Sequence, residues 1–212
     1  MHAIHQNQPV LIAGKPLAEA RAAMIMLHGR GSTAQSILTL AVELKQPDFA
    51  YLAPQARNNT WYPYRFLAPL ARNEPFLSSA LAAVADVVAY VENAGIPATH
   101  IFFLGFSQGA CLALEYVARH ARRYGGAIAY SGGLIGPDDA PRDYAGNLQQ
   151  TPIFIGCSDV DDHIPEPRVH ESGDILRRLG AITTIRIYPQ MGHTINQDEI
   201  DFAKSMMSAL GR

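Results

Sequence analysis

Short apolar runs bounded by turn-forming residues alternate along the chain with longer stretches in which apolar residues recur every three or four positions. Continuous apolar runs are typical of strands buried on both faces, and the longer period is typical of helices that cover a sheet. The sequence therefore predicts an α/β fold, with a mostly parallel sheet and helices on both faces. The predicted strands begin at or near Ala22, Phe49, Thr99, Gly125, Thr151 and Ile182.

The helical stretches lie between these runs and end at residues that break helices. Apolar spacing predicts helices at 77–91, at 110–121, at about 168–179 and from about Gln197. The segment 136–147 has the composition of a surface loop. Because these elements use nearly all of the chain, we predict a single domain over residues 1–212 with no large cap domain.

Composition and charge narrow the classes of function. The chain has 212 residues, of which 48% are hydrophobic, and its formal net charge is −2. No basic face is evident, so nucleic acid is not an expected partner. No apolar run reaches roughly 18 residues, which predicts no membrane insertion. The two cysteines, Cys111 and Cys157, are expected to be buried thiols of a protein in the reducing cytoplasm.

The stretch "LGFSQGACLALEYVARH", Leu104 to His120, places a serine between two glycines where a predicted strand meets a predicted helix. Gly105 and Gly109 stand two positions before and after Ser107, where a tight turn has no room for a side chain. Such a turn presents the serine hydroxyl at the sheet edge as a nucleophile. The alternative interpretation is an ordinary serine at the start of a helix.

A serine nucleophile needs a base, and eight histidines are available. His193, in "YPQMGHT", is preferred because it follows the last predicted strand and can reach the same sheet edge. His28 ends the first predicted strand and is assigned a structural role. The others outside the aspartate-rich segment are expected to be solvated, namely His2, His5, His100, His120 and His170.

The acid that orients the histidine is expected between serine and histidine in the chain. Asp159, Asp161 and Asp162 follow a predicted buried strand, and any of them is a candidate. Together with His163 they also form an alternative hard-cation site, although we predict no bound metal. In the remaining interpretation, the segment is a solvated acidic loop with neither a catalytic nor a metal-binding role.

Taken together, "LHGRGS", "GFSQGA", "SGG" at 131–133, the aspartate-rich turn reaching Pro165, and "YPQMGHT" resemble the phospholipase/carboxylesterase family of α/β-hydrolases. This resemblance implies an α/β-hydrolase fold and a serine hydrolase without a cofactor. In the family the acid stands four residues before a proline, which selects Asp161 and keeps Asp159 as the alternative. Proline usually follows that acid, whereas this chain has Asp162 there.

The family also implies an oxyanion hole made of two backbone N–H groups, here those of Arg30 and Gln108. The guanidinium of Arg30 would then be free to attract an anionic substrate. Trp61 and Tyr62 lie in an aromatic loop that is expected to be exposed and to form an acyl or alcohol pocket, unless they only pack over the sheet.

The implied activity is hydrolysis of carboxylic esters, or of thioesters, with small to medium acyl groups. Small-molecule esters are the expected partners, and a homodimer is compatible with the sequence. An acyltransferase that uses the same acyl-enzyme, and a non-catalytic ligand-binding protein of this fold, are the alternatives.

Overall fold

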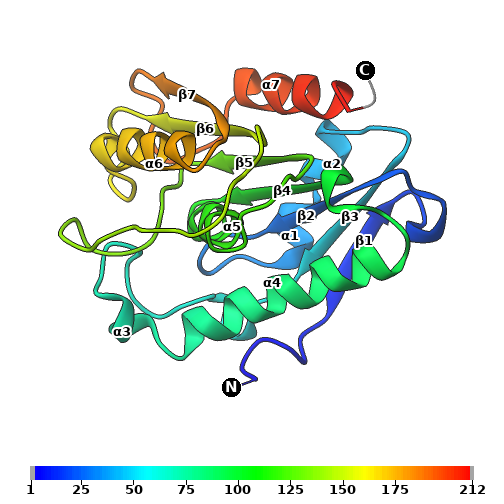
Figure 1. The fold of residues 1–212 in the computed structure, drawn as a ribbon, viewed down its shortest axis with the longest axis horizontal. Coiled ribbons are helices and arrows are strands. Elements are labelled where there is room, and N and C mark those ends of the chain that lie inside the picture. The colour runs from blue at the N-terminus through cyan, green and yellow to red at the C-terminus, as the bar shows by residue number, and fades with distance from the viewer. Residues whose placement is uncertain (1–2, 211–212) are drawn as a thin grey trace.

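The computed structural model describes residues 3–210, in which seven strands form one sheet. Their order is β1-β3-β2-β4-β5-β6-β7 (Figure 1). The edge strand β1 runs antiparallel to β3, and the other neighbouring pairs are parallel. The strands are β1 (Val10–Gly14), β2 (Ala22–Leu27), β3 (Phe49–Pro54), β4 (Ile101–Phe106), β5 (Gly126–Tyr130), β6 (Pro152–Ser158) and β7 (Ile182–Tyr188).

Helices connect the strands and lie on both faces of the sheet, as the sequence predicts. Side chains of α4, α5 and α6 pack on the face that carries Ile25 and Leu27, and those of α1, α2 and α7 pack on the opposite face with Met24 and Met26. The helices are α1 (Ala34–Leu38), α2 (Leu40–Glu43), α3 (Leu70–Asn73), α4 (Phe76–Asn93), α5 (Gln108–Arg119), α6 (Glu166–Arg178) and α7 (Gln197–Ser208). Short 3-10 helices occur at Leu17–Glu19, Arg57–Asn59 and Ala98–His100.

The structure contains elements that the sequence pattern does not predict. Strand β1 is short and lies at the sheet edge, where Val10 and Ile12 are exposed, so it lacks the continuous buried run of the central strands. Helices α1 and α2 have five and four residues, which is too short for a helical period to be recognised.

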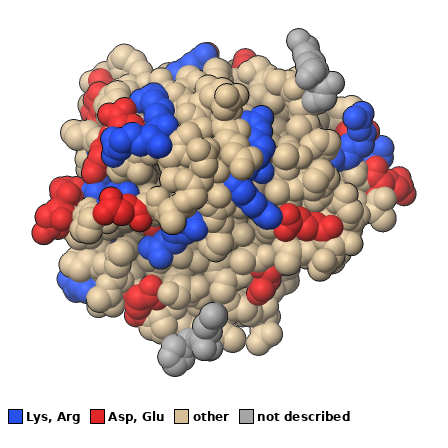
Figure 2. Space-filling model, in the orientation of Figure 1, with Lys and Arg blue, Asp and Glu red and all other residues tan. Residues whose placement is uncertain are grey.

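Within residues 3–210, α4 is the helix that is long and apolar enough, by length and composition alone, to cross a membrane. Half of its 18 residues are buried in the protein, with Leu77, Val84 and Val91 fully covered, so its apolar face is accounted for by packing on the sheet. On the face of the molecule that Figure 2 shows, positively and negatively charged side chains are interspersed.

Candidate active site

Ser107 occupies the turn between β4 and α5 in a strained backbone conformation. Its φ is 55° and its ψ is −119°, a combination that side-chain-bearing residues rarely adopt. A Cβ on Gly105 would lie 2.3 Å from the backbone of Gly109, and one on Gly109 would lie 2.0 Å from the carbonyl oxygen of Leu27. The two glycines therefore permit the close approach of β4, α5 and β2 that produces the turn.

Two hydrogen bonds link Ser107 to His193 and His193 to Asp161. The Nε2 atom of His193 lies 2.9 Å from Ser107 Oγ, and its Nδ1 atom lies 2.7 Å from Asp161 Oδ2. The three side chains come from loops after β4, β6 and β7, whose carboxyl ends meet at one edge of the sheet. The side chain of Asp161 is fully buried, whereas that of His193 is 21% exposed and faces the cavity.

The environment of Asp161 keeps its carboxylate charged. Burial opposes ionisation, but hydrogen bonds from His193 and from the backbone N–H groups of His163 and Ile164 outweigh it and lower the pKa of Asp161 to about 2. Asp159 instead accepts a hydrogen bond from the N–H of Gln190 at 2.8 Å. Of the two aspartates considered from the sequence, Asp161 is the one whose carboxylate contacts the imidazole.

Arg30 and Gln108 line the same cavity as Ser107. Gln108 is the first residue of α5, so its N–H has no partner within the helix. The N–H of Arg30 follows Gly29 in the β2–α1 loop, and within residues 3–210 neither N–H donates to another protein atom. The Arg30 guanidinium is not free as expected, because it donates to the carbonyl oxygens of Pro63 and Tyr64 at 2.8 and 2.5 Å.

The prediction that Trp61 is exposed and lines the pocket was wrong. Trp61 is fully buried, and its indole N–H donates to the carbonyl of His28 at 2.9 Å. Its ring packs against His28 and His5, with ring centroids 5.0 and 5.6 Å apart. Tyr62 is also 1% exposed, but it does line the cavity. The aromatic loop therefore packs over the sheet and presents one of the two predicted rings to the cavity.

Two further histidines have structural positions. His28 is buried; its Nδ1–H donates to the carbonyl of Gly29, and its Nε2 accepts from the N–H of Ala56. His5, expected to be solvated, is 2% exposed and bonds to the backbone of Arg57 and Trp61. His5 is buried by contacts with residues more than 50 positions away, so the residues next to it in the sequence do not indicate its burial. Of the remaining predicted surface histidines, His120 and His170 are exposed, His100 is half-buried, and His2 lies outside the described residues.

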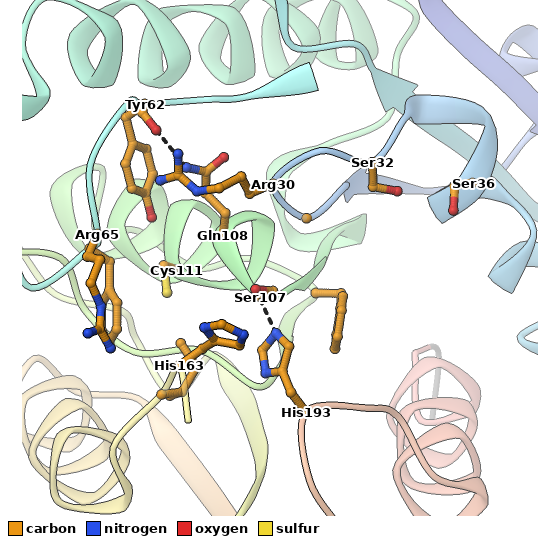
Figure 3. Close-up of a pocket in the computed structure, with 14 residues that line it drawn as sticks. Arg30, Ser32, Ser36, Tyr62, Arg65, Ser107, Gln108, Cys111, His163 and His193 are labelled. Atoms are coloured by element: carbon orange, nitrogen blue, oxygen red, sulfur yellow. Dashed lines mark hydrogen bonds between the residues drawn. The ribbon is translucent and has the colours of Figure 1, made fainter. Parts of the chain in front are cut away.

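Ser107 opens onto a cavity of about 420 Å³ that extends to both sides of the hydroxyl (Figure 3). Ser32 and Ser36 lie on one side, and Tyr62, Arg65 and Cys111 lie on the other. Burial raises the pKa of the Cys111 thiol to about 12, so the thiol stays protonated at neutral pH.

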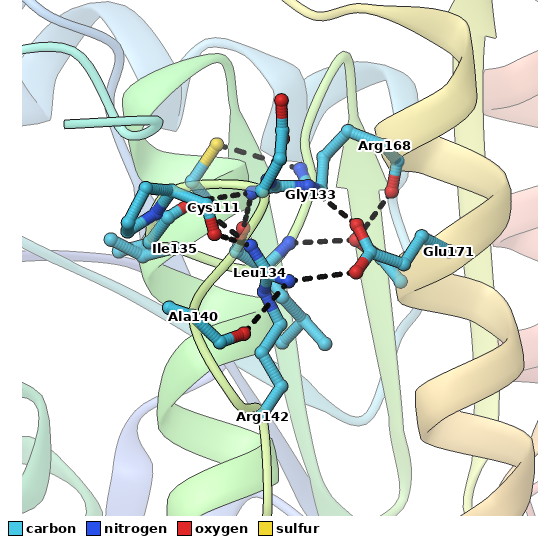
Figure 4. Close-up of polar contacts among 12 residues, drawn as sticks. Cys111, Gly133, Leu134, Ile135, Ala140, Arg142, Arg168 and Glu171 are labelled. Atoms are coloured by element: carbon cyan, nitrogen blue, oxygen red, sulfur yellow. Dashed lines mark hydrogen bonds and ion pairs between the residues drawn. The ribbon is translucent and has the colours of Figure 1, made fainter. Parts of the chain in front are cut away.

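Figure 4 shows the polar contacts of the loop after β5, which include Cys111 of the cavity wall. The N–H of Gly133 bonds to Cys111 Sγ, and the N–H of Ile135 donates to the buried carboxylate of Glu115. Arg168 of α6 is 3% exposed and donates to the carbonyls of Leu134 and Gly136. This loop is thereby tied to α5 and α6 by buried polar contacts, a support that no local motif in the sequence indicates.

Comparison with known proteins assigns the chain to a family. The family described as Phospholipase/Carboxylesterase matches residues 9–210. The chain belongs to this family. A crystal structure of a phospholipase/carboxylesterase from Dyadobacter fermentans superposes with a TM-score of 0.92 at 48% identity, covering 96% of this chain and 97% of that one.

More distant relatives carry related names. A probable carboxylesterase SOBER1-like protein of Arabidopsis thaliana is 24% identical over 89% of this chain and 78% of its own length. An acyl-protein thioesterase 1 of Debaryomyces hansenii is 29% identical over 52% of this chain and 48% of its own. The predicted family and α/β-hydrolase fold are confirmed, and between residues 3 and 210 no separate cap domain covers the sheet.

Proposed function

We propose that this family member is a serine hydrolase that cleaves carboxylic esters of small to medium acyl groups through an acyl-enzyme on Ser107. Thioesters with the same acyl groups belong to the proposed substrate class. The observation that carries the proposal is the hydrogen-bonded series Ser107, His193 and Asp161 at a strained turn beside a cavity. Family membership supports the same class of reaction.

In the first half of the proposed reaction, Ser107 Oγ attacks the ester carbonyl carbon while His193 Nε2 takes the hydroxyl proton. Asp161 holds the imidazole in the required orientation and stabilises its protonated form. The tetrahedral intermediate then collapses, and the alcohol leaves with the proton from His193. The acyl group remains as an ester of Ser107.

In the second half, a water molecule gives a proton to His193 and attacks the acyl carbonyl. Collapse of this second intermediate releases the carboxylic acid and returns the proton to Ser107. An alcohol or amine in place of water would give acyl transfer, which is the alternative outcome of the same acyl-enzyme.

The backbone N–H groups of Gln108 and Arg30 are the proposed donors to the oxyanion in both halves. Fixed N–H donors aimed at a developing negative charge contribute on the order of 3 kcal/mol each to transition-state stabilisation. The N-terminus of α5, which begins at Gln108, adds a favourable dipole for that charge.

Small-molecule esters are the proposed partners, and no cofactor enters the mechanism. We retain a cytoplasmic location as a proposal, because Cys111 and Cys157 are both buried and free of disulfides. Fractionation of the source cells, with detection of the protein in the soluble cytoplasmic fraction, tests this point.

The decisive experiment is hydrolysis of a chromogenic ester series from acetyl to octanoyl by the wild type, Ser107→Ala and Ser205→Ala. Ser205 is an exposed serine of α7 and serves as the matched control. We expect Ser107→Ala to lose roughly a thousandfold or more in kcat/KM and Ser205→Ala to match the wild type. Mass spectrometry of quenched wild type should show the acyl adduct on Ser107. Equal activity in all three proteins would refute the proposal.

A further inference from the structure

The cavity beside Ser107 is lined by both apolar and polar groups, and its arginines carry positive charge although the chain as a whole has a formal net charge of −2. Arg30, Arg65 and His163 line it, and none of its lining residues within the described chain is an aspartate or a glutamate. In Figure 3, Arg65 and His163 lie on the same side of Ser107 as Tyr62 and Cys111. We call these four residues the polar arm: Tyr62, Arg65, Cys111 and His163.

The two arginines at this cavity are not neutralised by carboxylates. Arg65 is exposed, and its guanidinium makes one long contact, 3.4 Å, with the carbonyl oxygen of Asp162. The Arg30 guanidinium is fixed on two carbonyls and lies 6.0 Å from the centre of the Tyr62 ring. Neither forms an ion pair with any residue between 3 and 210.

The inner end of the polar arm carries a buried hydroxyl whose polar neighbour is a thiol. Tyr62 Oη is buried; the Cys111 thiol is its polar neighbour, and no nitrogen or oxygen within residues 3–210 accepts its proton or donates to it. Burial raises the pKa of Tyr62 well above its usual value, so the group is a neutral donor. Glu115 acts on Tyr62 electrostatically but is itself buried and paired with Arg119 at 2.6 Å. A thiol is a weak hydrogen-bond acceptor, so a ligand oxygen would give this hydroxyl a stronger partner.

We propose that the polar arm selects esters that carry a carboxylate a few bonds away from the scissile carbonyl. Arg65 supplies the charge partner at the mouth, Tyr62 supplies a hydrogen-bond donor deeper in the arm, and the fixed charge of Arg30 adds to the attraction. This inference rests on the proposed ester hydrolysis and names its substrate class.

The chemistry of the arm explains why a carboxylate suits it better than a hydrocarbon chain. A planar guanidinium binds a carboxylate through two parallel hydrogen bonds. A hydrocarbon substituent would leave the Tyr62 hydroxyl with the Cys111 thiol alone and would displace water from Arg65 without replacing its hydrogen bonds. An ester that carries a carboxylate therefore binds in this arm more favourably than a neutral ester of equal size.

The test uses two pairs of esters of matched shape, assayed by pH-stat titration at pH 7. Monomethyl glutarate is compared with methyl 5-methylhexanoate, which replaces the carboxylate on the acyl side with an isopropyl group. 3-Acetoxypropanoate is compared with isopentyl acetate, which makes the same replacement on the alcohol side. The ratio of kcat/KM for the charged and the neutral member of each pair is the quantity measured. The pair with the higher ratio identifies the side of the ester that occupies the arm.

Arg65→Gln is compared with Arg178→Gln, which removes an exposed arginine of α6 outside this cavity and changes the net charge equally. We expect Arg65→Gln to lower the charged-to-neutral ratio about tenfold for one pair, Tyr62→Phe to lower it about fivefold, and Arg178→Gln to leave it unchanged. Raising the salt concentration should reduce the ratio in the wild type.

The outcomes separate this inference from the proposed function. Hydrolysis of neither charged nor neutral esters by the wild type would overturn the hydrolase proposal itself. Hydrolysis of both with a ratio that is the same in wild type and Arg65→Gln would overturn carboxylate selection and leave the hydrolase proposal standing. An equal fall in Arg178→Gln would also overturn it, because the effect would then belong to the net charge.

Discussion

The side-chain oxygen of Gln108 accepts a hydrogen bond from the backbone N–H of Trp61, with 2.9 Å between the two atoms. The amide nitrogen of the same side chain donates to the carbonyl of Tyr62 at 2.8 Å. Gln108 therefore fastens the aromatic loop to the first turn of α5, next to Ser107 (Figure 3). This attachment turns the Trp61 ring into the core and leaves the Tyr62 ring in the wall of the cavity.

We predict that Gln108→Ala loosens this loop without removing the backbone N–H of residue 108. Loss of two buried hydrogen bonds should lower the free energy of unfolding by about 1–3 kcal/mol and kcat/KM by roughly tenfold. Gln108→Glu retains the acceptor for Trp61 but places a buried carboxylate oxygen against the carbonyl of Tyr62, so its losses should be at least as large as those of the alanine variant. Denaturant unfolding and ester kinetics measure both quantities. An alanine variant equal to the wild type in both would show that the loop is held by other contacts.

Asp161→Asn and Asp159→Asn are predicted to differ strongly in activity. Asparagine at 161 cannot stabilise a protonated His193 and favours the wrong tautomer, so kcat should fall on the order of a thousandfold. Asparagine at 159 still accepts from the N–H of Gln190, so kcat should change by less than about threefold. Steady-state kinetics on one chromogenic ester checks both. A larger loss in Asp159→Asn would reverse the assignment of the acid.

Glu199 gives a prediction about stability and pH. Its carboxylate is buried in α7 with Oε1 unpartnered within the described chain, and burial raises its pKa to about 7 against a hydrogen bond from the N–H of Asn196. The folded state therefore binds a proton that the unfolded state releases near pH 4.5, and stability falls as the pH rises from about 4.5 to about 7.

We expect Glu199→Gln, which is neutral at every pH, to lack this decline and to exceed the wild type at pH 8 by on the order of 2 kcal/mol. Denaturant unfolding between pH 4 and pH 8 measures the difference. Glu43→Gln, which alters an exposed carboxylate of α2, is the control and should follow the wild type. His5 and His28, whose pKa values burial lowers, act in the opposite direction in both proteins, so a difference between Glu199→Gln and the wild type that does not grow over this range would contradict the prediction.

Local pattern in the sequence accounts for much of the fold and for the candidate site. The buried runs predict the parallel strands because a strand covered on both faces needs apolar side chains at every position. The glycines beside Ser107 predict the turn because only they fit its close backbone contacts. The sequence does not predict the edge strand β1, because Val10 and Ile12 are exposed and the strand lacks a continuous buried apolar run.

The amino-acid sequence alone indicates where the chain passes from strand to helix and which residues stand at the carboxyl ends of parallel strands. These features follow from the spacing of apolar residues and from glycines that leave room for a tight turn, and both are properties of short stretches of sequence. The family resemblance already selected Asp161, and the structure shows its contact with His193. The burial of Trp61 and the shared cavity of Arg65 and Tyr62 could be seen only in the tertiary structure. These relations join atoms far apart in the chain, and packing of the whole sheet and its loops sets their distances.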